Sequence, residues 1–455
     1  MGSNWPRVTV SDVCELIVDC VNKTAPVSAE PTPYKMIRTP NIKNGRVSTE
    51  DCRCVDIDTF TKWTRRATVE CDDVLLTREA PLGEVGIVSS SEKLFLGQRV
   101  MQYRVDKTKL DAHFLLYSFL SPDLQHQFSM HEGSGSVVSH IRVGDCSKFE
   151  LNLPPLNTQK KVVEILRNLD RKISLNNQIN QTLEAMAQAL FKSWFVDFDP
   201  VKAKMNGEQP AGMDAATASL FPEKLVESEL GLIPEGWSVK PLGDVSTFQN
   251  GYAFKSKELT TDTSSTTHKV FKMGNIRKGG GFNSKGSKDC FNLNSNPKVE
   301  RYLIKKGDLL MSMTDMKNNV ALLGHTALMP VSDEYLVNQR VGLIRKSDKH
   351  YLNYPFLYYQ TNEPLFLTDI RSRANSGVQV NLSTKGIKDT LLVVPPKDIH
   401  EVFDKQIRSY LEKMFSNDAQ SEELAKLRDL LLPKLLSGEI ELGHLQVEQV
   451  KVLVE

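Results

Sequence analysis

Residues that could bind a metal ion or attack a substrate are scattered along this sequence instead of being grouped. The seven cysteines are Cys14, Cys20, Cys52, Cys54, Cys71, Cys146 and Cys290. Cys52 and Cys54 are too close in sequence for a usual zinc knuckle, and no histidines have the His-Glu-x-x-His spacing of a zinc hydrolase. We therefore expect reduced thiols, no bound metal ion and no cofactor on this chain.

Two short segments resemble binding sites for phosphate or for a nucleotide base, but neither is complete. Gly279–Gly281 lacks the following Lys-Ser or Lys-Thr of a phosphate loop, so we interpret it as a turn. Asn152-Leu153-Pro154-Pro155 superficially matches the tetrad with which amino-methyltransferases hold a base, but Leu153 replaces the first proline and Leu156 the aromatic residue. The sequence therefore predicts a protein that catalyses no reaction itself.

If the chain binds DNA, the candidates for contact are Lys, Arg, Asn and Gln side chains together with a few Ser and His. Lys and Arg contact phosphates, whereas Arg, Asn and Gln can also pair with base edges. One set of candidates is Arg38, Asn41, Lys43, Asn44, Arg46, Arg78, Arg99, Ser134, Ser136 and His140. A second set is Lys272, Asn275, Arg277, Lys278, Arg340, Arg371, Arg373, Asn375, Gln379 and Asn381. For each of these residues the alternative is an ordinary solvated surface group.

The two sets occupy matching places in an internal repeat. The matches include Trp5 with Trp237, Asp12-Val13 with Asp244-Val245, Asp73-Val74-Leu75 with Asp308-Leu309-Leu310, Gln98-Arg99-Val100 with Gln339-Arg340-Val341, and Pro154-Pro155 with Pro395-Pro396. A repeat of this length is a whole domain. Two copies in one chain predict a molecule with internal pseudo-twofold symmetry.

Residues shared by both copies are weaker candidates for base reading than residues that differ. Asn41 recurs as Asn275, and Gln98 recurs as Gln339. If the two copies read different sequences, they would not use the same side chain for it, so we interpret the shared residues as turn caps or backbone brackets. Arg371 and Arg373 are the better candidates.

Charge is divided unequally between the copies. The net charge of the chain is +1, but residues 1–156 contain 18 Lys and Arg against 20 Asp and Glu, whereas residues 237–396 contain 22 against 13. A basic domain beside a nearly neutral one is compatible with nucleic-acid binding. The difference indicates that the copies meet different surfaces, or meet one polyanion with different strength.

Each copy combines short strands with short helices, which predicts an α+β fold with a strand-rich body. The expected strands are 73–77, 100–105, 308–312 and 391–394, and the expected helices are 112–120 and 354–359. Each copy ends in a Pro-Pro pair, which stops the sheet and releases the chain in a new direction.

A long helix is predicted after each Pro-Pro pair, near 158–195 and near 399–436. Apolar residues fall on alternating three- and four-residue steps in both, which is the pattern of a coiled-coil seam. Polar residues interrupt the seams at equivalent places, namely Asn176 and Asn180 in the first and Asn417 and Ser421 in the second. We expect these residues to fix the register of an antiparallel helix pair; the alternative is two unrelated amphipathic helices.

The resulting domain organisation has six parts. We predict a first α+β domain at 1–155, a central long helix at 156–199, a linker at 200–236, a second α+β domain at 237–396, a C-terminal long helix at 397–442 and a tail at 443–455. Apolar residues off the seam, Val162, Val163, Ile179, Met186, Phe191 and Phe195, favour outer helix faces that partner subunits cover. No apolar run is long enough to span a membrane, and we expect a cytoplasmic protein.

The ordered repeat resembles the specificity subunit of type I restriction-modification enzymes. Each copy has Asn-Ile-x-x-Gly (Asn41-Ile42 to Gly45; Asn275-Ile276 to Gly279), the Gln-Arg-Val strand, the Pro-Pro exit and a long helix. The segments Ala187–Val196 and Leu427–Leu442 are similar to that family's two helix endings. Each motif alone is weak, but their order, found twice, covers nearly the whole chain.

This resemblance implies two target-recognition domains that each read one half of a split DNA site, with the paired helices as a spacer. It further implies two docked methyltransferase subunits, which bind S-adenosylmethionine and methylate adenine, and translocating nuclease subunits that join for restriction. A competing hypothesis is a scaffold whose helices bind proteins while the domains no longer read DNA. The net charge of the first copy gives that hypothesis slight support.

Overall fold

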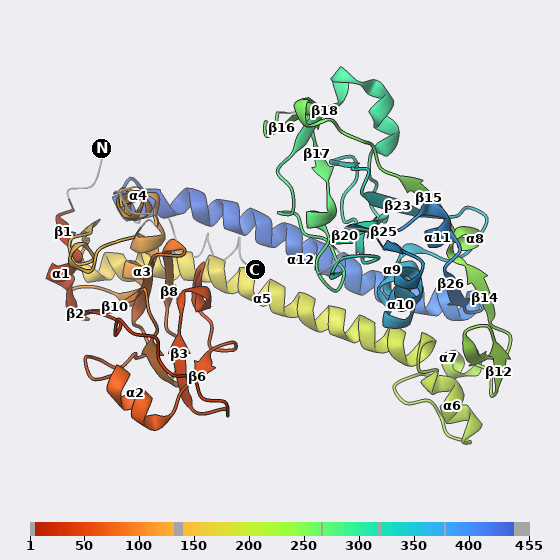
Figure 1. Ribbon diagram of the computed structural model, residues 1–455, viewed down its shortest axis with the longest axis horizontal. Coiled ribbons are helices and arrows are strands. Elements are labelled where there is room, and N and C mark those ends of the chain that lie inside the picture. The colour runs from red at the N-terminus through yellow and green to blue at the C-terminus, as the bar shows by residue number, and fades with distance from the viewer. Residues whose placement is uncertain (1–4, 132–139, 265–266, 317–319, 377–378, 441–455) are drawn as a thin grey trace. The chain divides into compact units, whose positions relative to one another are not determined.

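The computed structural model describes residues 5–131, 140–264, 267–316, 320–376 and 379–440 (Figure 1). The chain divides into two compact units: unit 1 holds residues up to Asn176 and from Ala419 onward, and unit 2 holds Asn177–Asp418. Each unit contains one copy of the repeat, called here a module. Each unit also contains part of α5 (Leu156–Phe195) and part of α12 (Lys397–Ser437), so both long helices contribute to both units.

The module of unit 1 is built on a six-stranded sheet of order β2-β10-β7-β8-β5-β4. Its strands are β2 (Cys14–Asp19), β10 (Val100–Val105), β7 (Val74–Arg78), β8 (Leu82–Ile87), β5 (Gly45–Val47) and β4 (Ile42–Lys43). The apolar runs of β7 and β10 are buried, with Val74, Leu76 and Tyr103 at 0% exposure. Both faces of these strands are buried, since Val74 and Leu76 belong to one core and Leu75 to another, which explains why their sequences lack a clear alternation of polar and apolar residues.

Two short helices cover this sheet. They are α3 (Ala112–Leu120) and α4 (Pro122–Ser129), and both pack against β8. Asp111 caps α3 by accepting hydrogen bonds from the amides of His113 and Phe114, and Ser121 caps α4. The rest of the module comprises α1 (Val10–Val13), α2 (Ile57–Trp63), the pair β1 (Arg7–Thr9) with β11 (Glu150–Asn152), and a sheet of β6 (Arg53–Cys54), β3 (Tyr34–Ile37) and β9 (Lys93–Leu96).

The module of unit 2 repeats the strand pairings of the unit 1 module. Its sheet of order β15-β23-β19-β21 comprises β15 (Ser246–Asn250), β23 (Val341–Lys346), β19 (Leu309–Ser312) and β21 (Thr326–Leu328). β14 (Ser238–Pro241) pairs with β26 (Leu391–Val394), as β1 pairs with β11. β17 (Thr267–Phe271) runs parallel to β22 (Tyr335–Val337), as β3 runs parallel to β9. The duplicated α+β module predicted from the sequence is therefore confirmed.

Further elements complete unit 2. They are α8 (Leu242–Val245), α9 (Tyr354–Asn362), α10 (Pro364–Ser372), α11 (Thr384–Lys388), β16 (Leu259–Thr260), β18 (Cys290–Asn292), and a small sheet of β20 (Thr314–Met316), β25 (Gln379–Asn381) and β24 (Asn375–Ser376). The segment predicted as a linker folds into α6 (Asp199–Met205), α7 (Ala215–Ser219) and the hairpin β12 (Leu225–Ser228) with β13 (Gly231–Pro234). Val201, Phe221 and Ile233 bury it in the unit 2 core.

The two long helices pack together antiparallel within each unit. In unit 1, Asp170 of α5 pairs with Arg428 of α12, and Asn176 with Ser421. In unit 2, Asn180 pairs with Asn417. Residue numbers fall along one helix as they rise along the other, which is the antiparallel arrangement predicted from the repeat. The pseudo-twofold relation of the halves stays a prediction.

The expectation that the apolar residues off the seam form exposed outer helix faces, available to partner subunits, is wrong for four of them. Val162 and Val163 are buried in the unit 1 core, and Phe191 and Phe195 in the unit 2 core, because each module packs onto the helices. Met186 remains 47% exposed. Within the described residues, no helix is both long and apolar enough to cross a membrane.

Candidate nucleic-acid interface

Basic side chains project from a tight turn in unit 1. Lys43, Asn44 and Arg46 are exposed where β4 folds back onto β5. Asn44 and Gly45 have φ of 51° and 80°, the left-handed region that Asn and Gly tolerate best. The backbone N–H of Asn44 donates to Glu84 Oε2 at 3.3 Å, so an acidic side chain lies against this turn.

The equivalent turn in unit 2 presents Arg277 and Lys278, both exposed. It is fixed by its backbone, because Arg277 N–H donates to Gly281 O and Gly281 N–H to Thr326 O, each at 2.9 Å. Gly280 has φ of 97°, and a Cβ there would lie 2.6 Å from Asn362 Oδ1. Only glycine fits this close approach, so the turn holds its two basic residues on a rigid support.

The shared asparagines brace these turns and do not face outward. Asn41 Oδ1 accepts from the backbone N–H of Arg38 at 3.0 Å, and Asn275 Oδ1 accepts from that of Lys272 at 2.9 Å. Both asparagines are buried, at 5% and 0% exposure. Their interpretation as backbone brackets is confirmed.

Arg38 and Lys272, which occupy the same place in the two turns, are only half-buried and are held by the protein. Lys272 forms an ion pair with Asp289. Arg38 has a buried Nε with no hydrogen-bond partner among the described residues. Neither side chain is presented as openly as those of Lys43 or Arg277.

A second group of candidates meets at the end of the central sheet. In unit 1, Arg78 N–H donates to Arg99 O, and Ile141 N–H, next to His140, donates to Arg78 O. In unit 2, Met313 takes the place of Arg78: its N–H donates to Arg340 O, and Leu382 N–H, next to Asn381, donates to Met313 O. The backbone thus brings these distant candidates together.

The side chains at this sheet end differ in how freely they are presented. Arg78 is half-buried and donates to Ile141 O at 3.1 Å, and the exposed Arg99 pairs with Glu79 at 2.6 Å. Arg340 is exposed and His140 half-buried. Ser134 and Ser136 lie outside the described residues.

The candidates after α10 are partly engaged within the protein. Arg371 Nε donates to Leu323 O at 2.9 Å, and Arg373 forms an ion pair with Asp369 at 3.0 Å. Asn375 and Asn381 are exposed and face each other across β24 and β25, while Gln379 is half-buried. The two arginines preferred from the sequence are therefore held more firmly than Arg277, Lys278 or Arg340.

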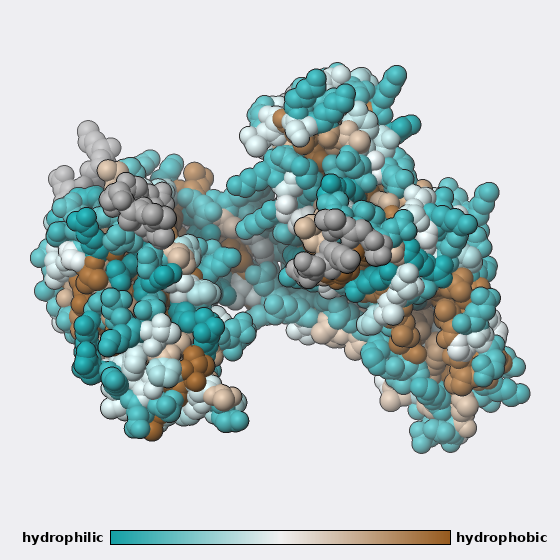
Figure 2. All heavy atoms as spheres, viewed as in Figure 1, coloured by the Kyte–Doolittle hydropathy of each residue, from teal (hydrophilic) through white to brown (hydrophobic). Residues whose placement is uncertain are grey.

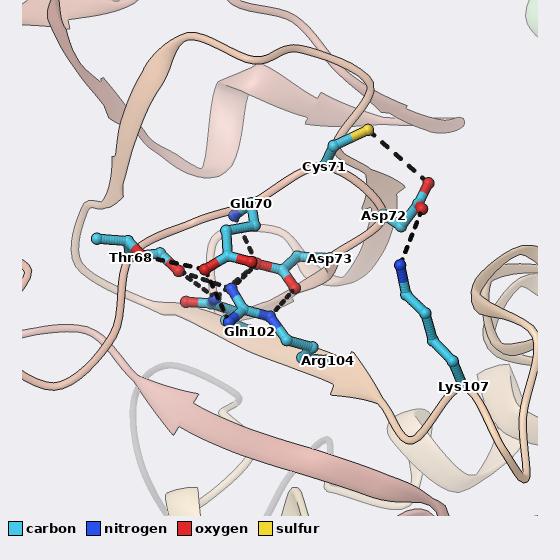
Figure 3. A network of polar contacts seen from close by, with 8 residues as sticks. All are labelled: Thr68, Glu70, Cys71, Asp72, Asp73, Gln102, Arg104 and Lys107. Atoms are coloured by element: carbon cyan, nitrogen blue, oxygen red, sulfur yellow. Dashed lines mark hydrogen bonds and ion pairs between the residues drawn. The ribbon is translucent and has the colours of Figure 1, made fainter.

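Sequence reasoning missed a polar network that braces the unit 1 sheet (Figure 3). Arg104 donates from Nε to Asp73 Oδ1 and from Nη2 to Asp73 Oδ2, both at 2.9 Å, and its Nη2 also reaches Thr68 O. Asp73 Oδ2 accepts from Glu70 N–H at 2.7 Å and from Gln102 Nε2. Asp73 is 1% exposed, so these bonds replace the water it loses on burial.

Unit 2 contains a copy of this network. Arg345 donates to both carboxylate oxygens of Asp308, at 2.8 and 2.7 Å, and to Leu303 O, while Asp308 Oδ2 accepts from Lys305 N–H. The sequence contained a signal for this network. Each Gln-Arg-Val strand has a second arginine five residues after the first, and the repeat already aligns Asp73 with Asp308. The same buried pair therefore ties the two central strands together in both modules, at the end of the sheet opposite Arg78 and Arg99 in unit 1 and opposite Arg340 in unit 2.

The polar residues of the helix seam are engaged with each other. In unit 1, Asn176 Nδ2 donates to Gln420 Oε1 at 2.9 Å and to Ser421 Oγ at 3.2 Å. In unit 2, Asn417 Nδ2 donates to Asn180 Oδ1 at 2.8 Å, and Asn180 Nδ2 to Asp418. Asn176 and Asn417 are each 2% exposed, so only the observed register satisfies their amides.

Hydrophilic side chains cover most of the face visible in Figure 2, with apolar residues in small groups. Among the residues that the structure describes, no group of three or more His, Cys, Asp or Glu could hold a metal ion. The arrangement offers exposed cations and amides on rigid turns, which suits contact with phosphates and base edges.

Comparison with known proteins assigns these features to one family. Residues 2–185 and 234–428 match the family model described as "Type I restriction modification DNA specificity domain". The Type I restriction enzyme HindI specificity subunit of Haemophilus influenzae is 30% identical over 369 residues, which cover 72% of this chain and 77% of that protein. The MjaIX specificity subunit of Methanocaldococcus jannaschii is 25% identical over 396 residues, covering 84% and 82%.

A solved structure agrees in fold. The crystal structure of the S subunit of a Type-I restriction-modification system from M. genitalium superposes with a TM-score of 0.56, at 15% identity, over 95% of this chain and 96% of that one.

Proposed function

Because this chain belongs to the type I restriction-modification DNA specificity family, we propose that each module reads one half of a bipartite DNA site. One observation carries this proposal: the two modules share one frame, including the Asp–Arg networks and the bracketing asparagines, but differ in the exposed residues of their turns. A fixed frame with variable exposed contacts is what two readers of different sequences require.

The antiparallel helices act as the spacer between the half-sites and as the docking surface for two methyltransferase subunits. The buried asparagine contacts support the spacer role, because they penalise any slip of one helix along the other. Half-site separation in DNA-binding proteins follows from such geometry. Translocating nuclease subunits would join this assembly for restriction.

The specificity chain performs no catalysis in this proposal. The methyltransferase subunits bind S-adenosylmethionine and methylate adenine, and they must extrude the target base from the stack to do so. The two modules hold the duplex while this happens.

Selection of binding sites tests the proposal. The chain is assembled with purified methyltransferase subunit and incubated with a pool of random-sequence DNA, and bound DNA is sequenced. We expect one enriched motif with two specified halves and a spacer of constant length. A motif with a single specified half contradicts the two-module reading, and no enrichment by an intact complex favours the protein scaffold.

A further inference from the structure

Arg99 has a backbone conformation that is unfavourable for arginine. It lies in the turn between β9 and β10, and its φ is 71°, in the left-handed region that glycine and asparagine tolerate best. Among the described residues that have a positive φ and are not glycine, Arg99 is the only basic one. A turn of this shape would be more stable with glycine, so the arginine points to a use for its side chain outside the turn.

The rest of the fold makes little use of this side chain. The Arg99 side chain is 51% exposed, and its Nε lies 2.6 Å from Oε1 of Glu79, which is 25% exposed. Within the part of the chain that the structure describes, this ion pair is the only polar contact of the guanidinium. Exposed ion pairs stabilise folded proteins little, so the pair does not account for an arginine at this strained position.

Other charged groups lie at this end of the unit 1 sheet. Arg78 turns inward and donates to a backbone carbonyl oxygen at 3.1 Å. Asp19, at the end of β2, forms an ion pair with Arg66, and Lys23 in the loop after β2 is exposed. None of these four residues has a positive φ. The pair of Arg99 with Glu79 therefore differs from them in combining exposure with a strained backbone.

Unit 2 has an arginine at the matching place but in a different setting. Arg340 is exposed, its φ is not positive, and among the described residues it has no ion-pair partner within 4.0 Å. Thr314, which is 4% exposed and uncharged, occupies the place of Glu79 in the repeat. An exposed cation without a carboxylate beside it suits a DNA phosphate. The two arginines share a place in the fold but differ in conformation and in charge environment.

The carboxylate of Glu79 decides which DNA group suits Arg99. A phosphate bound to Arg99 would bring a second negative charge close to Glu79, and like charges repel. A base edge is neutral and avoids this repulsion. Because Glu79 lies against Nε, the two terminal nitrogens of the guanidinium remain to donate. Guanine presents two adjacent acceptors, O6 and N7, in the major groove, and arginine binds them with two parallel hydrogen bonds.

We propose that Arg99 reads a guanine in the half-site bound by the unit 1 module, and that Glu79 is a positioning residue that keeps its guanidinium off the phosphates. The inference rests on the proposed function. It also revises the expectation that residues shared by the two copies do not read bases, because the same residue type, as Arg99 and Arg340, stands in two different settings.

Site selection with an arginine variant tests the inference. Arg99→Gly removes the side chain and suits the left-handed backbone, so the turn keeps its shape. Wild-type and variant chains, each assembled with purified methyltransferase subunit, select from random-sequence DNA, and competition binding then measures preference at each position. We expect the wild-type motif to contain a guanine preferred about 30-fold over other bases, and Arg99→Gly to lose that preference alone.

Two further variants test the role of the carboxylate and the contrast between the copies. Glu79→Gln should lower the guanine preference to about threefold and tighten binding to all sequences at low salt, because the guanidinium can then reach a phosphate. Glu15→Gln, an exposed glutamate at the other end of the same sheet, is the matched control and should leave the preference unchanged. Arg340→Ala should keep the whole motif and reduce the salt slope by about 0.9.

The outcomes separate this inference from the function on which it rests. An unchanged motif in Arg99→Gly overturns the inference and leaves the proposed function standing. Loss of preference throughout one half overturns it as well, because Arg99 would then place the whole module instead of reading one base. Equal effects of Glu79→Gln and Glu15→Gln overturn the positioning role. A wild-type complex that enriches no bipartite motif overturns the proposed function itself.

Discussion

Removing the two exposed charges of the unit 2 turn should flatten the salt dependence of DNA binding. Arg277 and Lys278 are exposed, and within the described residues neither side chain has an ion-pair partner, so both are available to phosphates. The logarithm of the binding constant falls with the logarithm of salt concentration by about 0.9 per neutralised phosphate. The variant Arg277→Ala with Lys278→Ala should therefore reduce the slope by about 1.8, twice that value.

The same relation gives the loss of affinity. If the wild-type and variant isotherms converge near 1 M salt, a slope difference of about 1.8 corresponds to roughly 60-fold weaker binding at about 0.1 M. Fluorescence anisotropy of a labelled duplex, titrated with the assembled methyltransferase complex at several salt concentrations, measures both quantities. The stiff Gly280 support predicts that the loss comes from charge and not from collapse of the turn.

Two comparisons make the test decisive. Lys346→Ala with Lys349→Ala removes the same charge from exposed sites elsewhere in unit 2 and should change the slope much less. A slope reduction equal to that of this control would refute the assignment, because it would mean that only net charge matters. Arg371→Ala with Arg373→Ala should give an intermediate loss, since both side chains already have partners inside the protein.

Three further outcomes follow from buried groups. Asp308→Ala should lower the free energy of unfolding by about 3 kcal/mol, because it leaves Arg345 without its carboxylate. Urea unfolding followed by circular dichroism measures this loss, and a loss well below that value would contradict the prediction. Asn176→Leu with Asn417→Leu should preserve helix content but yield several species on native mass spectrometry, and one homogeneous complex would make the asparagines incidental. Burial raises the pKa of Glu184, on α5, in the folded state, so the protonated side chain favours folding. This contribution to stability is fully present below the pKa of the unfolded chain and is lost as pH rises through the pKa of the folded chain. Glu184→Gln should remove that slope from a series of pH-dependent melting curves, and an unaltered series would contradict it.

The repeated frame could be predicted from sequence because its signals are local and occur twice. The seam pattern identified the helices found as α5 and α12, and the expected helix at 112–120 coincides with α3. Matching asparagines led to the correct interpretation of Asn41 and Asn275 as brackets. A pattern that recurs at matching positions of both copies rarely arises by chance, so the repeat made each of these predictions stronger.

The contacts that decide which basic residues are free could not be predicted in this way. Arg371 and Arg373 were preferred because they differ between the copies, but the carbonyl oxygen that accepts a hydrogen bond from Arg371 belongs to Leu323, 48 residues away in sequence. The burial of Phe191 and Phe195 likewise depends on residues of α9 and α12, such as Phe356 and Phe403. Hydrophobic periodicity predicts that a helix has an apolar face, but it does not predict which distant segment of the chain packs against that face.

The division of the chain into units has a consequence for synthesis on the ribosome. Unit 2 is continuous in sequence, from Asn177 to Asp418, so it can complete its core as soon as that stretch has emerged. The unit 1 core, by contrast, includes Leu432, Leu435 and Leu436 of α12, which are made after almost everything else. The first module synthesised should therefore be the last to reach full stability. Part of its apolar surface stays uncovered until the end of α12 has been synthesised. A chain truncated before residue 419 should therefore have a first module that is selectively sensitive to protease.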